Sequence, residues 1–212
     1  MKDNYILTAE SVTAGHPDKL CDTIADSILD ACLKEDPNAR VAYEVLATAG
    51  KILVAGELRT TASPDVEYIV RQTVRNAGYD CNYHVEVRLH TQSPDIAGAV
   101  DGDTLGAGDQ GIMYGYACWE TVELLPAPVV LANRITSLLT TCREEKLISG
   151  IGPDGKAQVS VQYAFGVPER VDTIVISCQH DADKGLDELR EELRRLVIAR
   201  ACHDVRIDEQ TK

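Results

Sequence analysis

Apolar residues recur at a helical spacing in four segments of the chain. In residues 17–35 they form one wide stripe, and Pro17 stands where a first helical turn tolerates proline. Residues 63–78 repeat this period, with Ser63 in the position of a cap and Gly78 in the position of a stop. The sequence predicts helices here and, from the same spacing, in residues 128–146 and 185–200.

Strict alternation of apolar and polar residues, which is typical of half-buried strands, marks the remaining regular segments. It predicts two strands joined at Gly50–Lys51 and three more strands, in residues 83–90, 157–165 and 170–179. Residues 111–119, GIMYGYACW, also look like a strand. The order strand–helix–strand–strand–helix is thus present twice, and only the first copy ends with a further strand. We expect an α+β fold of two tandem units, with mixed sheets and helices packed on one face.

The segment Thr91–Gly111 is rich in glycine and aspartate and has almost no periodicity. Long irregular loops inside compact domains are either functional or mobile, so a lid over the reaction and a solvated linker both fit. We predict an N-terminal unit over residues 1–95, a flexible active-site loop and linker over residues 96–111, and a second unit over residues 112–212.

Charge and composition exclude several classes of protein. The 212 residues carry 34 acidic and 21 basic side chains, a formal charge of −13, which argues against a nucleic-acid or acidic-membrane binder. The N-terminus has no apolar run typical of a signal peptide, and no stretch reaches the length of a membrane span. Seven scattered cysteines without a CxxC pair fit neither zinc nor disulfide frameworks, so we expect a cytoplasmic protein.

The stretch Gly15–Lys19, GHPDK, opens the first predicted helix. Free amide groups at a helix start favour phosphate, and His16 can donate to a phosphate or to a leaving oxygen. Asp18 can hold Mg²⁺, which keeps oxygen ligands and substrate phosphates. The same residues also fit a proline-started helix with an acid near its positive end, so the pentapeptide alone leaves both interpretations open.

Three more charged positions have a functional and a plain interpretation. Glu44 and Glu57 lie in apolar-rich strands, where a carboxylate can bind a cation or a ligand's ammonium group, or can face solvent. Lys156 follows Pro153–Gly155, whose composition predicts a turn before a strand. It can meet a phosphate as a point charge or remain solvated, and spacing does not decide between these roles.

Eight blocks of sequence, read together and in order, resemble the N-terminal and middle portions of the S-adenosylmethionine synthetase family, also called methionine adenosyltransferases. The blocks are ESVTAGHPDKLCDTIADSILDA, DPNARVAYEV, LVAGELRT, QSPDIAGAV, GAGDQGIMYGYA, LPAPVVLANRI, PDGKAQVSVQY and VDTIVISCQHD. Each block is modest alone, but eight in order make a specific match.

The resemblance implies attack by the sulfur of methionine on the 5′ carbon of ATP. The released triphosphate is then cleaved to pyrophosphate and phosphate. It also implies Mg²⁺ and K⁺ as cofactors, and active sites formed between subunits of a dimer. Because a thioether sulfur is a neutral nucleophile that needs no general base, the lack of an evident Ser–His or Cys–His pair is consistent with this chemistry.

Site residues follow from the resemblance position by position. His16 would contact ATP and stabilise the departing triphosphate, Asp18 would be a Mg²⁺ ligand, and Lys19 would add a supporting cation. Glu44 matches the K⁺ position. The other matches are to substrate-binding positions: Glu57 and Gln92 for methionine, Asp109 for the substrate pocket, and Asp154 and Lys156 for ATP.

The sequence departs from the family pattern in three places. The family's third unit, which supplies lysines and an arginine for triphosphate, has no counterpart here. LISGIGPDGK lacks the tryptophan and arginine that usually precede the proline–aspartate turn, and Asn133 stands where histidine is common. We therefore expect an incomplete chain or one half of a split enzyme, acting as a homo-oligomer or with a complementing C-terminal half. The alternative is a non-catalytic binding subunit of a full-length synthetase.

Overall fold

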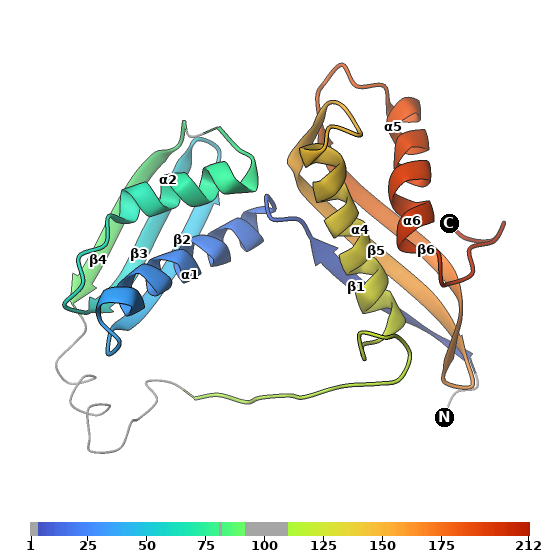
Figure 1. Ribbon diagram of the computed structural model, residues 1–212, viewed down its shortest axis with the longest axis horizontal. Coiled ribbons are helices and arrows are strands. Elements are labelled where there is room, and N and C mark those ends of the chain that lie inside the picture. Colours follow the sequence, from blue (N-terminus) through green and yellow to red (C-terminus); the bar gives the residue numbers. More distant parts are fainter. Residues whose placement is uncertain (1–3, 81, 92–109) are drawn as a thin grey trace. The chain divides into compact units, whose positions relative to one another are not determined.

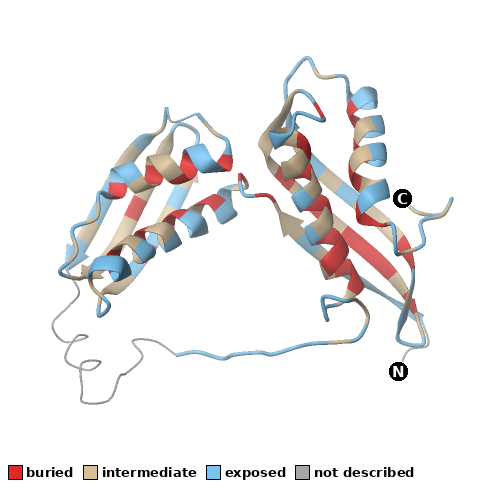
Figure 2. Cartoon of the chain, viewed as in Figure 1, coloured by how far each residue is buried: buried red, intermediate tan, exposed pale blue. Residues whose placement is uncertain are grey.

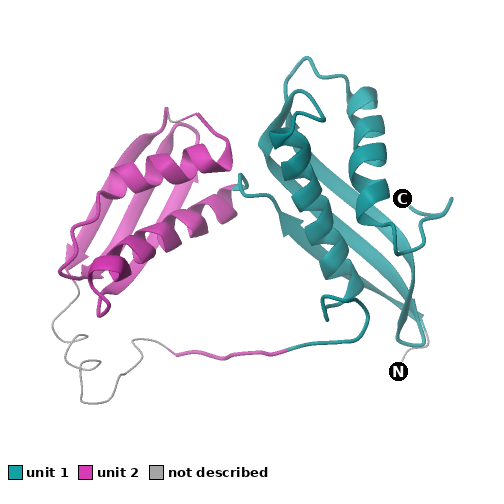
Figure 3. Ribbon diagram, viewed as in Figure 1, with its two compact units in different colours: residues 1–16, 116–212 teal, residues 17–115 magenta. Residues whose placement is uncertain are grey.

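The chain folds into two units, each built on a three-stranded sheet (Figure 3). This computed structural model describes residues 4–80, 82–91 and 110–212. Residues 1–16 and 116–212 form unit 1, and residues 17–115 form unit 2. The N-terminal strand therefore packs with the second half of the chain.

Unit 2 has a mixed sheet with both of its helices on one face (Figure 1). The sheet order is β2-β3-β4, in which β2 is antiparallel and β4 is parallel to β3. A parallel pair needs a crossover connection, and α2 provides it. The elements are α1 (Pro17–Glu35), β2 (Arg40–Thr48), β3 (Lys51–Arg59), α2 (Val66–Ala77) and β4 (His84–Thr91).

The core of unit 2 is the apolar stripe that the helical period predicts, packed on alternate strand residues (Figure 2). Ile24 and Ile28 of α1 are fully buried, as are Ile52 and Val54 of β3. Side chains alternate between the two faces of a strand, so the residues between them point to the face that the helices do not cover. That face carries Glu44.

Unit 1 has an antiparallel sheet of order β1-β5-β6, also with its helices on one face (Figure 1). β1 in its full length pairs with the C-terminal part of β5, from the pair Asn4–Ala164 to the pair Val12–Lys156. The elements are β1 (Asn4–Val12), α4 (Ala127–Glu144), β5 (Ile151–Ala164), β6 (Val167–His180), α5 (Leu186–Leu193), the π-helical turn η1 (Arg194–Ile198) and α6 (Ala199–Ala201).

The core of unit 1 lies between this sheet and α4, α5, η1 and α6. Tyr163 is fully buried, and its ring stacks on Tyr5 with the ring centroids 4.9 Å apart. The Tyr163 hydroxyl donates a hydrogen bond of 2.5 Å to Glu120, which ties the segment before α4 to the sheet. Burial and this carboxylate raise the pKa of Tyr163 above its ordinary value.

The predicted α+β class, the repeated helix–strand–strand–helix order and the packing of helices on one face are confirmed. The strand predicted in residues 111–119 is wrong: residues 110–118 form no strand. Their apolar side chains, including Ile112 and Met113, are largely exposed. In unit 1 the place beside β5 is taken by β1, which comes from the other end of the chain.

The predicted cap of the second helix is also wrong. α2 begins at Val66, and the side chain of Asp65, not Ser63, accepts the hydrogen bond from the Tyr68 amide at 2.9 Å. The predicted stop is confirmed, since Gly78 caps the C-terminus with φ of 102°, a left-handed conformation that glycine adopts without strain.

The turn predicted at Pro153–Gly155 lies instead inside β5. Between the pairs Ile151–His180 and Gly155–Cys178 the register shifts, so Gly152, Pro153 and Asp154 face a single residue of β6. We call these three residues the β5 bulge. A bulge bends a strand and redirects its side chains.

No helix in the described ranges is long and apolar enough to cross a membrane. Six cysteines fall in those ranges, and all six are free thiols. The sequence predicted consecutive segments divided at residues 95 and 111. In the structure, contacts group residues 1–16 with residues 116–212. The division drawn from the sequence stays a prediction.

Candidate functional site

The loop that leads into the first helix lies directly against the β5 bulge. Thr13, just beyond β1, donates its hydroxyl to the Pro153 carbonyl at 2.7 Å, and its amide donates to the Gly155 carbonyl at 2.9 Å. The His16 amide then donates to the Thr13 carbonyl at 3.0 Å, closing a tight turn. Two segments far apart in the sequence, each predicted to contact ATP, are thus joined within unit 1.

Glycine allows this close approach. A Cβ atom at Gly15 would lie 2.4 Å from the Pro153 carbonyl oxygen, well inside any real contact. The obstructing atom belongs to the backbone, so no side-chain movement could relieve the overlap. The glycine of TAGH therefore allows the loop to pack against the bulge, and His16 directly follows this glycine.

The bulge is also held from the β6 side. The Asp154 amide donates to the side-chain oxygen Oε1 of Gln179 at 3.1 Å. The register shift leaves the Asp154 amide opposite the side chain of Gln179 and without a paired backbone residue. The side chain of Gln179 provides the replacement.

Lys156 lies two residues past the bulge and forms an ion pair with Glu10 of β1, with a nitrogen–oxygen distance of 2.8 Å. Both side chains are nearly half exposed, at 43% and 46%. Exposed pairs of this kind contribute little to stability, so Lys156 can exchange this partner for a phosphate at small cost. Lys156 therefore remains accessible to an anionic ligand.

Cys178 of β6 pairs with Gly155, the residue directly after the bulge, and its thiol is a poor nucleophile. Burial, followed by the charge of Asp154, raises the pKa of Cys178 to about 11. At neutral pH the side chain is a protonated thiol, and the thiolate is the reactive form. Cys178 is therefore not a candidate covalent catalyst.

Asp18 and Lys19 belong to the first turn of α1, directly after His16 in the chain. Both are exposed. Among the residues that the structure describes, no cluster of three or more His, Cys, Asp or Glu could hold a metal ion. A single carboxylate such as that of Asp18 fits the usual Mg²⁺ site, in which one or two carboxylates act together with substrate phosphates and water.

Glu44 and Glu57 lie on the face of the unit 2 sheet that its helices leave uncovered. Glu44 pairs across the sheet with Ala55, and Glu57 with Ala42, so the two glutamates are diagonal neighbours on adjacent strands. Glu44 is exposed and Glu57 is partly buried. Neither carboxylate points into the core, and both remain open to a ligand or a cation.

Two predicted site residues, Gln92 and Asp109, lie outside the described residues. The sequence missed three others in unit 1: Glu10, Thr13 and Gln179. Alternation along residues 4–12 does place Glu10 on one face with Thr8 and Val12. No sequence pattern connects Gln179 with Asp154, because their contact exists only through the register shift.

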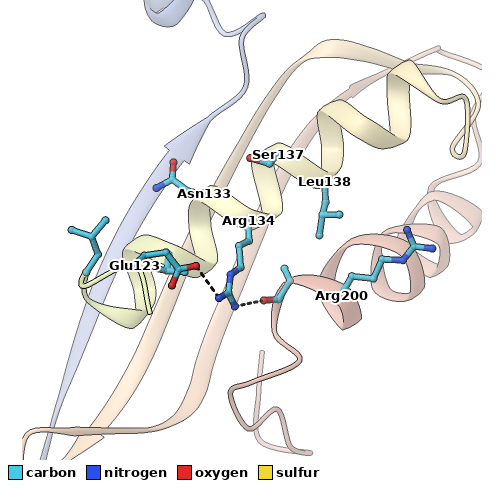
Figure 4. A pocket seen from close by; sticks show the side chains of 9 residues that line it. Glu123, Asn133, Arg134, Ser137, Leu138 and Arg200 are labelled. Atoms are coloured by element: carbon cyan, nitrogen blue, oxygen red, sulfur yellow. Dashed lines mark hydrogen bonds and ion pairs between the residues drawn. The ribbon is translucent and has the colours of Figure 1, made fainter. Parts of the chain in front are cut away.

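A groove of about 430 Å³ lies elsewhere on unit 1, between α4, α6 and the segment before α4 (Figure 4). Arg134 reaches across it and pairs with Glu123 at 3.0 Å (Figure 4). It also pairs with Asp204 at 2.8 Å. None of the predicted site residues lines this groove. The guanidinium of Arg134 is already paired with these two protein carboxylates. The candidate site therefore remains the bulge and the His16 turn.

Comparison with known proteins identifies the family that the sequence blocks resemble, and its two matches cover nearly the whole chain. Residues 4–102 match the family described as S-adenosylmethionine synthetase, N-terminal domain. Residues 104–212 match the family described as S-adenosylmethionine synthetase, central domain.

Curated relatives agree. The chain is 44% identical to an S-adenosylmethionine synthase of Finegoldia magna, over 99% of this chain and 58% of the relative. It is 45% identical to the synthase of Desulfosudis oleivorans, over 100% of this chain and 58% of the relative, and 47% identical to that of Nitratiruptor sp., over 93% and 54%. The chain thus spans a little over half the length of the relatives it matches. It belongs to the S-adenosylmethionine synthetase family.

Proposed function

We propose that this chain forms part of a methionine adenosyltransferase, which transfers the adenosyl group of ATP to the sulfur of methionine. The products are S-adenosylmethionine, pyrophosphate and phosphate. The observation that supports this most is the contact of the His16 turn with the β5 bulge, because it brings together two segments, far apart in the sequence, that are both proposed to bind ATP. Membership of the family supports it independently.

The chemistry asks for orientation and for neutralisation of charge. The attacking sulfur is neutral and carries no proton that must be removed, so the protein needs to align sulfur, carbon and leaving oxygen and to stabilise the negative charge that grows on the triphosphate. The protonated thiol of Cys178 fits a direct displacement without a covalent enzyme intermediate.

Each residue has a proposed role in that scheme. His16 donates a hydrogen bond to the departing triphosphate, and Lys19 adds positive charge three residues further along the chain. Asp154 and Lys156 bind ATP, and Lys156 leaves Glu10 to do so. Methionine is bound by the remaining predicted residues, Glu57 and Gln92, with Asp109 completing the substrate pocket.

Family membership implies metal ions, and we propose Mg²⁺ and K⁺. Asp18 would hold Mg²⁺ through its carboxylate, and Glu44, exposed on the open face of the unit 2 sheet, would hold K⁺. When bound, the cations supply charge neutralisation to the phosphates, which an acidic chain of net charge −13 does not supply by itself. The carboxylates of Asp18 and Glu44 provide the oxygen ligands that these hard cations prefer.

The proposed partners are ATP, methionine and further protein chain. We propose a homo-oligomer or a complex with a complementing C-terminal half, in the cytoplasm and without nucleic acid or membrane. An acidic surface disfavours both nucleic acid and anionic lipid.

Complementation tests this function. The purified chain, given ATP, methionine, Mg²⁺ and K⁺, is expected to form little or no S-adenosylmethionine alone. Addition of a separately purified polypeptide, covering the part of the Finegoldia magna synthase that the chain does not match, is expected to produce turnover. Failure to produce turnover, with both polypeptides folded and associated, would favour the binding-subunit alternative.

The variant His16→Asn tests the leaving-group role in the complemented enzyme. The shorter asparagine side chain withdraws its donor from the position of the histidine ring, and loss of one donor to a developing oxyanion typically lowers turnover about 100- to 1000-fold. Methionine affinity is expected to stay unchanged, since His16 acts on the triphosphate. A loss of methionine affinity with unchanged turnover would contradict the role.

A further inference from the structure

The β5 bulge depends on a matched pair of residues that the proposed function does not include. Gly152 opens the bulge, and Gln179 is the one residue of β6 that faces all three bulge positions. The Gln179 carboxamide lies over Gly152: a Cβ atom there would be 2.4 Å from Oε1 and 2.5 Å from the carboxamide carbon. The absence of a side chain at Gly152 therefore creates the space that Gln179 fills.

Gln179 uses this space to reach Asp154. Its Oε1 accepts the Asp154 amide hydrogen at 3.1 Å, at a position where the shifted register gives Asp154 no paired residue on β6. On the opposite side, Thr13 holds the carbonyls of Pro153 and Gly155. Thr13, just beyond β1, thus holds the Pro153 carbonyl of the bulge and the adjacent Gly155 carbonyl, and Gln179 of β6 holds the Asp154 amide.

We propose that Gln179 is a positioning residue, which fixes the orientation of Asp154 for nucleotide binding and does so only because residue 152 is glycine. This rests on the proposed role of Asp154 in binding ATP. Gln179 itself need not touch the nucleotide. Its effect passes through the Asp154 amide, which sets the backbone from which the Asp154 carboxylate projects.

The pair predicts an unusual pattern of mutational effects. Gln179→Ala removes the acceptor. Gly152→Ala displaces it, because the carboxamide is the flexible end of a side chain and yields to a new Cβ atom. Both variants therefore lose the same hydrogen bond, and the double variant has nothing further to lose. Contacting residues are expected to show such non-additivity.

The test uses the full chain labelled with ¹⁵N, with hydrogen exchange measured at the Asp154 amide and MgATP as the probe for binding. Each single variant is expected to lose protection at Asp154 and to bind MgATP about three- to tenfold more weakly. The double variant should be no weaker than either one. Gln179→Glu keeps an acceptor oxygen and should retain protection, and Gly115→Ala, where a Cβ atom meets nothing within 4 Å, is the matched glycine control.

The outcomes are separable. Undiminished protection of Asp154 in Gln179→Ala, or additive losses in the double variant, would overturn the pairing. Lost protection with unchanged MgATP affinity would overturn the positioning role and leave the proposed function intact. Failure of the wild-type chain to bind MgATP, despite a protected Asp154 amide, would count against the nucleotide role of the bulge and would overturn the positioning role with it.

Discussion

Thr13 connects the two parts of the candidate site through one side chain. It is only 6% exposed, and its hydroxyl reaches both the Pro153 carbonyl, at 2.7 Å, and the Gly155 carbonyl, at 3.2 Å. A buried carbonyl that loses its hydrogen-bond donor carries an uncompensated desolvation cost. The single hydroxyl of Thr13 therefore contributes measurably to the stability of the fold.

Thr13→Ala is therefore expected to destabilise the chain by about 1 kcal/mol, because two carbonyls lose their side-chain donor. Thr13→Ser keeps the hydroxyl and is the matched control. Urea unfolding measures the difference in free energy of unfolding. Equal losses in the alanine and serine variants would show that the methyl group, not the hydroxyl, is what stabilises the contact.

Individual site residues were predictable to different degrees from the sequence. For His16, Asp154 and Lys156 the local motifs left a plain interpretation open, and only the family resemblance assigned them to ATP. The structure brings their segments together in unit 1. Gln179 was not predictable. Its partner is chosen by a register shift, which depends on the geometry of two strands and not on any local pattern.

At the level of elements, helices were predicted better than strands. Helical period and end caps are local, so the stripe of α1 and the glycine stop of α2 were visible in the sequence. A strand exists only where a partner strand lies beside it. Residues 111–119 look like a strand in the sequence, yet β1 pairs with β5 instead, and the sequence alone does not reveal that choice.

The corrected cap of α2 gives a test at this scale. Asp65→Ala is expected to cost about 1 kcal/mol of stability, because the Tyr68 amide loses its acceptor at the start of the helix. Ser63→Ala, at the position that the sequence predicted, should have little effect. Thermal unfolding of both variants gives the comparison, and a larger loss for Ser63→Ala would restore the original assignment.

The edge of the unit 2 sheet predicts a response to acid. Hydrogen bonds from Lys51 and then from Arg88 lower the pKa of Glu86 from 4.5 to about 2. A carboxyl with a depressed folded pKa adds stability that is complete above its unfolded value and disappears as pH falls toward the folded value. The window is therefore between pH 4.5 and about pH 2.

Glu86→Gln removes this titration. The difference in free energy of unfolding between the wild-type chain and Glu86→Gln is expected to be constant near neutral pH and to shrink as pH falls through that window. A difference that stays constant down to pH 2 would mean that the ion pairs of Glu86 do not stabilise the folded state. Denaturant titrations at several pH values provide the measurement.

At the scale of the whole molecule, an acidic chain is proposed to bind a polyanion. The formal charge of −13 repels ATP at long range, so binding needs local donors and cations rather than a general basic surface. The His16 turn, the bulge and Lys156 supply donors and one cation within unit 1. Bound metal at the predicted carboxylates would supply the rest.

The most direct test of this site is an NMR titration of the ¹⁵N-labelled chain with MgATP. The account predicts that the amides of His16, Asp154 and Lys156 shift together, with one apparent affinity, while amides lining the Arg134 groove do not move. Shifts confined to that groove, or to residues outside both segments, would contradict the claim that the turn before α1 and the β5 bulge form one nucleotide site.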